Sequence, residues 1–446
     1  MDPITLTANR TKTNMTISIT DTVLSTLSTL KEQNQNLTTN IKLSSPFTSQ
    51  TQNNATFNSS WLSTNSTPIT NLIENYSSTV QTTIPNNLAG LIFNLNQTDS
   101  DNAISSVFAI VLLEDNLIAC SKESTLFIAD YSSGLIKFQT SPHKNEIRAL
   151  VSLKNNIFAS GSDDSTIKIW NATSNECLFT FNSSNGGHTS YVRLLTALGN
   201  NLLISGASQD PNLKVWNVLT GTLIMTLNNG FSIQALVSLK NEIYFATGSS
   251  QEIRIWNVLT GTLIGNPLKS GNVFSLAPIN SRSDLLACGD LNGAVSLWNI
   301  SSGSLLFKSK GHNSRVSFLL SLENNLLASI DVSFVSSIQI WNLTSGQIKY
   351  TFDKTNGGHT GTISSLSSLE NNLLASGGAG DFDIRIWDLN VGILKHRFNR
   401  SSGGHCQTVK VLTPLGGNLL ASGGDRGSWG GPGNTFDGSV KIWRVF

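Results

Sequence analysis

Short runs of apolar and β-branched residues alternate with polar turns from about residue 107 to the end of the chain. Ile157-Phe158-Ala159 is one such run; a tight polar turn around Asp163-Asp164 follows it, and Thr166–Trp170 forms the next run. This arrangement predicts two antiparallel strands joined by a turn. The pattern returns along the chain and each time ends in an apolar residue followed by tryptophan, at Trp216, Trp256, Trp298, Trp341, Trp387 and Trp443. A repeat of about 40–45 residues is the spacing of four-stranded propeller blades.

The strands that this repeat implies can be counted. Eight first strands are predicted, at residues 107–113, 147–153, 192–198, 233–239, 273–279, 316–322, 363–369 and 409–415. Eight third strands are also predicted, and in the first of them, 125–130, Ala129 stands in place of tryptophan. Only seven fourth strands follow, whereas the run 91–97 has the composition of a fourth strand and no blade before it. We therefore predict an all-β fold: an eight-bladed β-propeller of four-stranded antiparallel blades, closed by this N-terminal strand.

Asparagine pairs stand between the predicted first and second strands. They are Asn155-Asn156, Asn200-Asn201, Asn324-Asn325 and Asn371-Asn372. Asn tolerates the positive φ that tight hairpins require, so these pairs predict short turns that differ little between blades.

The N-terminal residues do not repeat and are rich in Ser, Thr and Asn, so we expect two parts, a polar arm (1–85) and a propeller (86–446). Within the arm, apolar residues and one asparagine are spaced by four and three residues, as in a coiled coil: Val23, Leu27, Leu30, Asn34, Leu37 and Ile41. A flexible polar arm is the alternative, because Ser and Thr disfavour helices. Asn-x-Ser/Thr glycosylation acceptors are dense from the arm to the first repeat, at Asn9, Asn14, Asn36, Asn54, Asn58, Asn65, Asn75 and Asn96, and they matter only in a secreted protein.

The repeat resembles the WD-repeat (WD40) family of β-propellers. In that family, His, Ser, Asp and Trp form a buried, hydrogen-bonded tetrad within a blade, and four sets of residues match it: His143, Ser160, Asp164 and Trp170; His188, Ser205, Asp210 and Trp216; His359, Ser376, Asp381 and Trp387; and His405, Ser422, Asp437 and Trp443. The match is partial in the repeat that ends at Trp341. It fails in the repeats that end at Ala129, Trp256 and Trp298, which we expect to be held mainly by apolar packing.

Ser, His and Asp within hydrogen-bonding reach also describe a hydrolase triad. Four copies at fixed repeat positions, each beside a core tryptophan, favour a structural role instead. The chain has no P-loop and no His-Glu-x-x-His, its Gly-rich run 423–433 does not follow the dinucleotide fingerprint, and its four cysteines show no Cys-x-x-Cys spacing. We predict that the protein is not an enzyme and that it has no catalytic, cofactor-binding or metal-binding residues and no small-molecule substrate.

Three loops between second and third strands are longer than the others and carry aromatic residues. They span residues 331–337, 378–383 and 425–436, in the last three repeats. An aromatic cluster on variable loops is either a binding patch or a local core that folds over the ring. We predict a partner-binding patch around Phe334, Phe382, Arg426, Trp429 and Phe436, because Trp and Arg are enriched at interface hot spots.

The charge of the chain excludes some functions more than it indicates one. Charged residues make up 13% of the chain and the formal net charge is +1, which gives no basic field for nucleic acid. No apolar run is long enough to predict a membrane span, and no secretory signal is visible. A surface of hydroxyls and amides is nevertheless more usual in secreted proteins, so composition favours an extracellular location, with a cytoplasmic one as the alternative.

Two functions fit these features. The first is a non-enzymatic scaffold that binds a protein partner on the variable loop face. The second is a structural subunit of a self-assembling, extracellular polymer, in which the arm reaches other copies of the chain.

Overall fold

The computed structural model describes residues 39–41, 55–57, 89–95, 105–199, 201–239, 242–334, 336–425 and 437–446. The chain divides into two units, Met1–Pro85 and Asn86–Phe446, which we describe separately. In the first unit, β1 (Thr39–Ile41) pairs with β2 (Ala55–Phe57) in an antiparallel ladder. The coiled-coil and glycosylation predictions concern residues that lie almost entirely outside the described ones.

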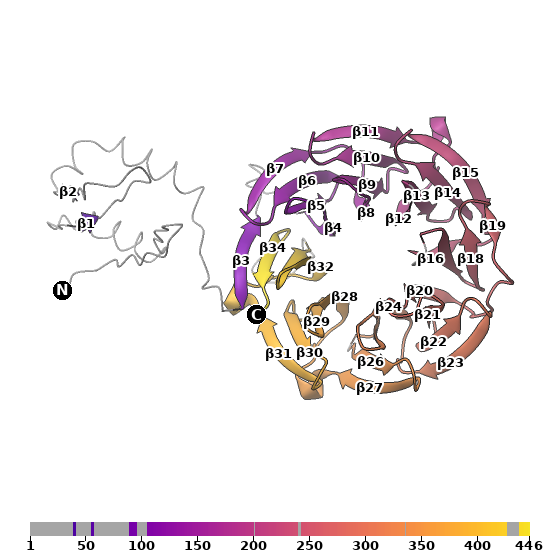
Figure 1. Ribbon diagram of the computed structural model, residues 1–446. Coiled ribbons are helices and arrows are strands. Elements are labelled where there is room, and N and C mark those ends of the chain that lie inside the picture. The colour runs from indigo at the N-terminus through magenta and orange to yellow at the C-terminus, as the bar shows by residue number, and fades with distance from the viewer. Residues whose placement is uncertain are drawn as a thin grey trace. The chain divides into compact units, whose positions relative to one another are not determined.

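The second unit is a ring of eight four-stranded antiparallel sheets, here called blades 1 to 8 (Figure 1). The strands of blades 1 to 4 are β4 (Val107–Leu112), β5 (Leu117–Lys122), β6 (Thr125–Asp130) and β7 (Leu135–Thr140); β8 (Ile147–Ser152), β9 (Ile157–Ser162), β10 (Ile167–Asn171) and β11 (Glu176–Phe181); β12 (Val192–Leu198), β13 (Leu202–Ala207), β14 (Asn212–Asn217) and β15 (Thr222–Asn228); and β16 (Ile233–Ser238), β17 (Tyr244–Ser249), β18 (Ile253–Asn257) and β19 (Thr262–Leu263). Those of blades 5 to 8 are β20 (Val273–Pro278), β21 (Leu285–Asp290), β22 (Ala294–Asn299) and β23 (Ser304–Lys310); β24 (Val316–Ser321), β25 (Leu326–Asp331), β26 (Ile338–Asn342) and β27 (Gln347–Phe352); β28 (Ile363–Leu369), β29 (Leu373–Gly378), β30 (Ile384–Asp388) and β31 (Ile393–Phe398); and β32 (Val409–Gly416), β33 (Leu419–Gly424), β34 (Val440–Arg444) and β3 (Gly90–Leu95). The predicted eight-bladed all-β propeller is confirmed.

The ring closes between the two ends of this unit. β3 pairs with β34, and the register places Leu91 opposite Trp443 and Leu95 opposite Val440. β3 is therefore the fourth strand of blade 8, as the count of strands predicts, and it precedes blade 1 in the chain. The described strand is Gly90–Leu95, close to the predicted 91–97.

The hairpin turns have the backbone that the asparagine pairs predict. Asn155 and Asn156 both have φ of 57°, and the pairs at 324–325 and 371–372 also have positive φ at both residues. Two consecutive residues of positive φ define the turn that matches the twist of a two-residue hairpin. Short turns of one kind therefore connect the first and second strands in these blades.

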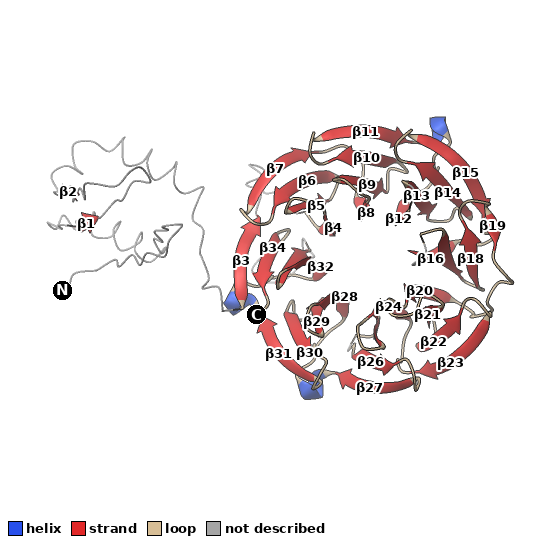
Figure 2. Cartoon of the chain, viewed as in Figure 1, coloured by secondary structure: helices blue, strands red, loops and turns tan. Residues whose placement is uncertain are grey.

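Three short 3₁₀ helices precede three of the tetrad histidines: η1 (Ser183–Asn185), η2 (Lys354–Asn356) and η3 (Arg400–Ser402), blue in Figure 2. Each begins with a capping box and ends at a glycine of positive φ. In η1 this glycine is Gly186, and the next residue, Gly187, donates its N–H to Asn182 O, 2.6 Å away. A Cβ on Gly187 would collide with that same carbonyl. The Gly-Gly-His sequence thus lets the chain turn sharply and direct the histidine into the blade.

The core lies between blades. Phe181, from the last strand of blade 2, stacks on Trp216 of blade 3 with ring centroids 4.1 Å apart. Phe352 stacks in the same way on Trp387, at 4.3 Å. The aromatic residue at the end of one blade therefore packs against the tryptophan of the next, which fixes the spacing of the ring.

Candidate functional site

The four predicted tetrads come together as continuous hydrogen-bonded chains. In each, the tryptophan Nε1–H donates to the serine Oγ (2.7–3.0 Å), the serine Oγ lies 2.7–2.8 Å from His Nε2, and His Nδ1 lies 2.8–3.1 Å from the aspartate. The serine comes from the second strand, the tryptophan from the third, and the histidine from the segment before the first strand. Each tetrad therefore ties three parts of a blade together.

Charge in the tetrads rests on the aspartates. Burial alone would raise the pKa of Asp381, but the hydrogen bonds that it accepts from His359 and from Thr360 N outweigh burial and lower this pKa to about 2. The pKa values of Asp164, Asp210 and Asp437 are lowered for the same kind of reason. Burial lowers the pKa of His188 and His405, despite their aspartate partners.

A neutral histidine completes this chain of donors and acceptors. With Nδ1–H donating to the aspartate, Nε2 accepts the serine O–H, and the serine oxygen in turn accepts the tryptophan N–H. All four serines have no exposed surface. A buried hydroxyl that is occupied on both sides cannot meet a substrate unless the blade opens, so the geometry is that of a structural connection between strands.

The other blades contain shorter versions of this chain. In blade 4, Trp256 Nε1 donates to Thr247 Oγ1 (3.1 Å), and Thr247 donates to Asn229 Oδ1 (2.7 Å). The expectation of mainly apolar packing misses this polar chain, because Thr and Asn replace Ser and His. In blade 5, Ser270 Oγ lies 3.1 Å from Cys288 Sγ, and Trp298 Nε1 has no hydrogen-bond partner in the described part of the chain.

Blade 6 contains a histidine that lacks its aspartate. His312 Nε2 lies 2.6 Å from Ser329 Oγ, but His312 Nδ1 is 3.9 Å from Asp331 and has no hydrogen-bond partner among the described residues. Burial lowers the pKa of His312 to about 4, although the charge of Asp331 acts in the opposite direction. A proton on this ring is therefore disfavoured in the folded protein.

We expect acid to destabilise the protein partly through His312. The unfolded chain takes up this proton below the ordinary histidine pKa of about 6.5, whereas the folded protein resists it until about pH 4, so the free energy of unfolding falls as the pH is lowered through this window. In urea unfolding between about pH 7 and pH 4, His312→Asn should reduce this fall. Asn is chosen because Asn229 accepts the equivalent bond in blade 4. An equal fall in both proteins would contradict the assignment.

Every first strand has a β-bulge near its start, and these bulges lie around the centre of the ring. The extra residues are Phe108, Arg148, Arg193, Gln234, Phe274, Ser317, Ser364 and Lys410, here called the mouth residues. They belong to the innermost strands in Figure 1. None of these residues was predicted to be functional from the sequence. The signal was available, because all occupy the second position of a predicted first strand.

The cations among the mouth residues are already paired. Asp163 accepts two hydrogen bonds from Arg193 (2.8 and 2.9 Å) and one from Arg148 (3.1 Å), which joins blades 2 and 3. Lys410 lies 3.1 Å from Asp425. The Arg148 guanidinium and the Lys410 ammonium also lie 4.1 and 4.4 Å from the centroid of the Phe108 ring. These contacts join neighbouring blades. They also leave no clear excess of charge around these mouth residues.

Comparison with known proteins agrees with this geometry. The family model described as "WD domain, G-beta repeat" matches residues 136–171 and 346–388, which include Trp170 and Trp387. The WD repeat-containing protein pop2 of Schizosaccharomyces pombe is 26% identical over 223 residues, or 49% of this chain, and the match spans 30% of that relative's length.

Two solved structures share the ring. The computationally designed Ika8 protein has a TM-score of 0.64 and 25% identity, over 80% of this chain and 100% of that one. The structure of U3-55K has a TM-score of 0.51 and 20% identity, over 79% and 98%, a likeness of fold alone. The chain is thus an eight-bladed β-propeller in which two stretches match the WD-repeat model. WD-repeat propellers are typically non-enzymatic scaffolds that bind other proteins.

The structure describes two of the five predicted partner-binding residues, and these two differ in exposure. Phe334 is 94% exposed on the loop between β25 and β26. Phe382 is half-buried, with φ of 62°, between the tetrad residue Asp381 and the buried Asp383. Arg426, Trp429 and Phe436 lie outside the described residues. Of the predicted patch, Phe334 is therefore the residue that the structure places almost fully in solvent.

The loop that carries Phe334 is held firmly on both sides. Ser333 Oγ donates to Asp331 Oδ1 (2.7 Å), and the buried Ser336 donates to the carbonyls of Asp331 (3.1 Å) and Ser333 (2.9 Å). Ser336 Oγ also accepts the N–H of Ile363 in blade 7, at 3.4 Å. The loop is thus attached to the next blade while Phe334 projects away from it.

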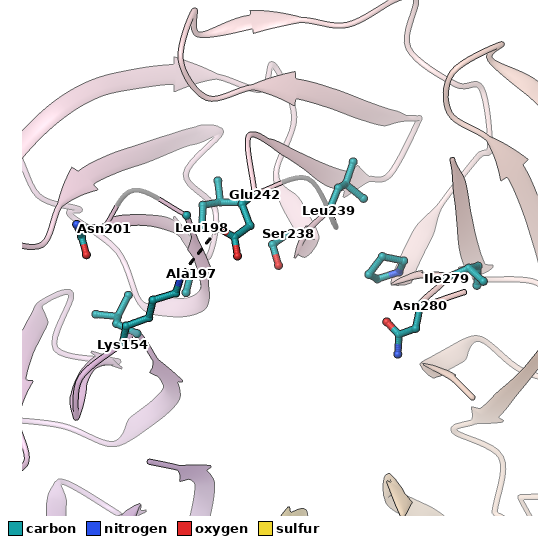
Figure 3. A pocket seen from close by; sticks show the side chains of 12 residues that line it. Lys154, Ala197, Leu198, Asn201, Ser238, Leu239, Glu242, Ile279 and Asn280 are labelled. Carbon is teal, nitrogen blue, oxygen red and sulfur yellow. Dashed lines mark ion pairs between the residues drawn. The ribbon is translucent and has the colours of Figure 1, made fainter. Parts of the chain in front are cut away.

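A depression of about 550 Å³ lies among the turns that join the first and second strands (Figure 3). Lys154 and Glu242 form an ion pair of 4.0 Å across part of it, and both side chains are more than half exposed. Leu239, Pro278 and Ile279 line the other side. An exposed pair of this length holds its geometry weakly, so this depression has few fixed groups that could orient a ligand.

Two further properties of the described residues concern membranes and metals. Among them, no helix is long and apolar enough to cross a membrane. The same residues contain no group of three or more His, Cys, Asp or Glu side chains placed to hold a metal ion.

Proposed function

We propose that this protein is a non-enzymatic scaffold, whose propeller (86–446) binds a protein partner on the face that carries the loops between second and third strands. Phe334 is the central anchor of the contact. The observation that carries the proposal is the near-complete exposure of this large apolar side chain on a loop that is itself held by buried hydrogen bonds.

A fixed loop favours binding at this place. Exposing a phenylalanine to water is unfavourable, and a partner that covers it recovers roughly 1.5–3 kcal/mol. Because Ser336 and Asp331 already fix the loop, little further conformational entropy is lost when the partner binds. Large aromatic side chains that are fixed in advance are typical interface hot spots.

Arg315 provides a second anchor next to this loop. Its carbonyl accepts the N–H of Val332 (3.3 Å), and its exposed guanidinium lies 5.0 Å from the centroid of the Phe274 ring. No ion pair joins Arg315 to a carboxylate among the described residues, in contrast to Arg148 and Arg193 at the mouth. An arginine and a phenylalanine so placed suit a partner segment in which an acidic residue lies close to an apolar one.

The alternative function, assembly through the N-terminal arm, depends on residues 1–85. Only β1 and β2 of that unit are described, and neither bears on assembly. Among the described residues, no feature favours this alternative over the scaffold.

We expect Phe334→Ala to reduce recovery of the partner by at least about tenfold when the tagged full chain is purified from its own cells. The melting temperature should stay within about 2 °C, because the side chain is exposed. The matched control is Leu135→Ala, which truncates an exposed apolar residue on the outer edge of blade 1. A partner kept by wild type and Leu135→Ala but lost from Phe334→Ala supports the proposal. An identical set of bound proteins in all three would contradict it.

A further inference from the structure

An asparagine that is followed by glycine can react with its own backbone. The nitrogen of the next residue attacks the side-chain amide, and a glycine leaves that nitrogen unhindered because it has no Cβ. The chain contains four such pairs: Asn185-Gly186, Asn229-Gly230, Asn292-Gly293 and Asn356-Gly357. All four lie among the described residues of the propeller, so their surroundings can be compared.

The capping boxes of η1 and η2 hold the amides of two of these asparagines. In η1, Asn185 Oδ1 accepts the N–H of Asn182 (2.8 Å), and Asn185 Nδ2 donates to Thr180 O (2.8 Å). Asn356 makes the equivalent two bonds in η2, at 3.0 and 2.6 Å. Both ends of each amide are bonded, so the side chain can turn toward the following nitrogen only after both bonds break.

A third asparagine, Asn229, is held inside blade 4. It is buried, its Oδ1 accepts the hydroxyl of Thr247 (2.7 Å), and its Nδ2 donates to Phe231 O (3.1 Å). The attacking nitrogen is engaged as well, because the N–H of Gly230 donates to Asn228 Oδ1 (2.7 Å). Both reacting groups of this pair are therefore restrained.

The fourth asparagine, Asn292, has neither kind of restraint. It is exposed in the turn between β21 and β22, and its side chain forms no hydrogen bond with any described residue. Only its backbone is held, since the N–H of Asn292 donates to Asp290 Oδ1 (2.9 Å). The N–H of Gly293 reaches Asp290 O at 3.4 Å, beyond the usual length of such a bond. The amide and the nitrogen are thus both available to react.

We propose that Asn292-Gly293 is the pair that deamidates spontaneously in the folded protein, because the fold restrains the other three. Gly293 N loses its proton to solvent base and attacks Asn292 Cγ. The new C–N bond forms, the Cγ–Nδ2 bond breaks, and Nδ2 leaves as ammonia after taking up a proton. Water then opens the resulting succinimide at one of its two carbonyls, which gives aspartate or isoaspartate. The proposal does not depend on the proposed function.

The products change this turn in two ways. Each places a negative charge where the amide was neutral, on the same set of loops that carries Phe334. Isoaspartate also adds one methylene to the backbone next to the buried Gly293. Gly293 O accepts the N–H groups of Gly311 (3.3 Å) and His312 (3.1 Å), and a Cβ on Gly293 would collide with His312 O. The turn has no spare room on this side, so isoaspartate should displace it from the segment that leads to Arg315.

The test is peptide mapping by mass spectrometry while the full chain is incubated in neutral buffer at physiological temperature. Aspartate and isoaspartate should accumulate at Asn292 at least about tenfold faster than at the other three asparagines, because each of those amides must first break two hydrogen bonds. An isoaspartate-specific methyltransferase should label the same peptide. The matched variant is Asn292→Gln, whose longer side chain forms the ring more slowly. It should abolish labelling of this peptide and leave the other three sites unchanged.

A second incubation in denaturant shows whether the fold sets this order. The four pairs should then convert at similar rates, because the bonds that protect Asn185, Asn229 and Asn356 are absent from the unfolded chain. Equal conversion of all four pairs in the folded chain would overturn the proposal. So would an Asn292 that stays intact in the folded chain. An advantage of Asn292 that is equally large in denaturant would overturn it too, since neighbouring residues and not the fold would then set the order.

Discussion

Deletion of Gly90–Leu95 from the full chain should abolish cooperative folding. β3 contributes the whole fourth strand of blade 8, so its removal exposes the edge of β34 and opens the ring between blades 8 and 1. It also removes Leu95, which is buried with Val107 and Phe127 of blade 1 in one cluster. We expect aggregation, or loss of the sigmoidal transition in thermal unfolding followed by circular dichroism.

A point substitution separates the contact between blades from the length of the strand. The Phe93 side chain packs against the turn of blade 1 at Gly134, where a Cβ would lie 2.6 Å from its ring. Phe93→Asp should therefore lower the free energy of unfolding by roughly 1.5–3 kcal/mol, below the range for a fully buried aromatic side chain because Phe93 is only partly buried. Asn94→Asp is the control, because Asn94 is exposed on the same strand and should change stability by about 0.5 kcal/mol at most. A deletion variant that melts like wild type would show that β3 does not close the ring.

Much of this fold could be predicted because the repeat supplies the same evidence for each strand in several blades. A single run such as Thr166–Trp170 predicts one strand, but eight first strands and eight third strands leave one fourth strand to be found. That count assigns the fourth strand to the run 91–97, and β3 spans Gly90–Leu95. The asparagine turns were predictable for a local reason, since few other residues tolerate two consecutive positive φ values.

The polar contacts of the site were less predictable, because they join residues that lie on different strands. Asn229 and Thr247 replace His and Ser in blade 4, and no motif marks them as a pair; only the folded register brings them within 2.7 Å. Asp163 stands next to the tetrad residue Asp164, yet it binds Arg193 of the following blade, a contact between residues thirty apart in the chain. Such contacts between blades cannot be read from one repeat.

The exposure of side chains on loops could also not be predicted from the sequence. Phe334 and Phe382 occupy similar loops in adjacent blades, and both were predicted to belong to one patch. The structure separates them: the first projects into solvent, while the second lies between Asp381 and Asp383, which bind Arg385. The second loop contains these ion pairs and the first does not, and aromatic content alone cannot show either arrangement.

Ser376→Ala should cost roughly 2–4 kcal/mol of unfolding free energy. The Ser376 Oγ accepts from Trp387 Nε1 (2.9 Å) and lies 2.8 Å from His359 Nε2. The substitution leaves both ring nitrogens buried without a partner, and each such group costs about 1–3 kcal/mol. Urea unfolding measures the change. The effect should be large because the tetrad joins β29, β30 and the segment before β28 in one chain of bonds.

Ser367→Ala provides the matched control for this prediction. Ser367 lies in β28 of the same blade and is also buried, but its hydroxyl has no hydrogen-bond partner among the described residues. Removing it relieves a buried polar group, so the substitution should be neutral or slightly stabilising. Both variants remove a serine hydroxyl from the same blade, and they differ only in whether that hydroxyl is hydrogen-bonded. Equal destabilisation by both would mean that burial alone, and not the tetrad, sets the cost. A large loss confined to Ser376→Ala would establish that the hydrogen-bonded chain stabilises the blade.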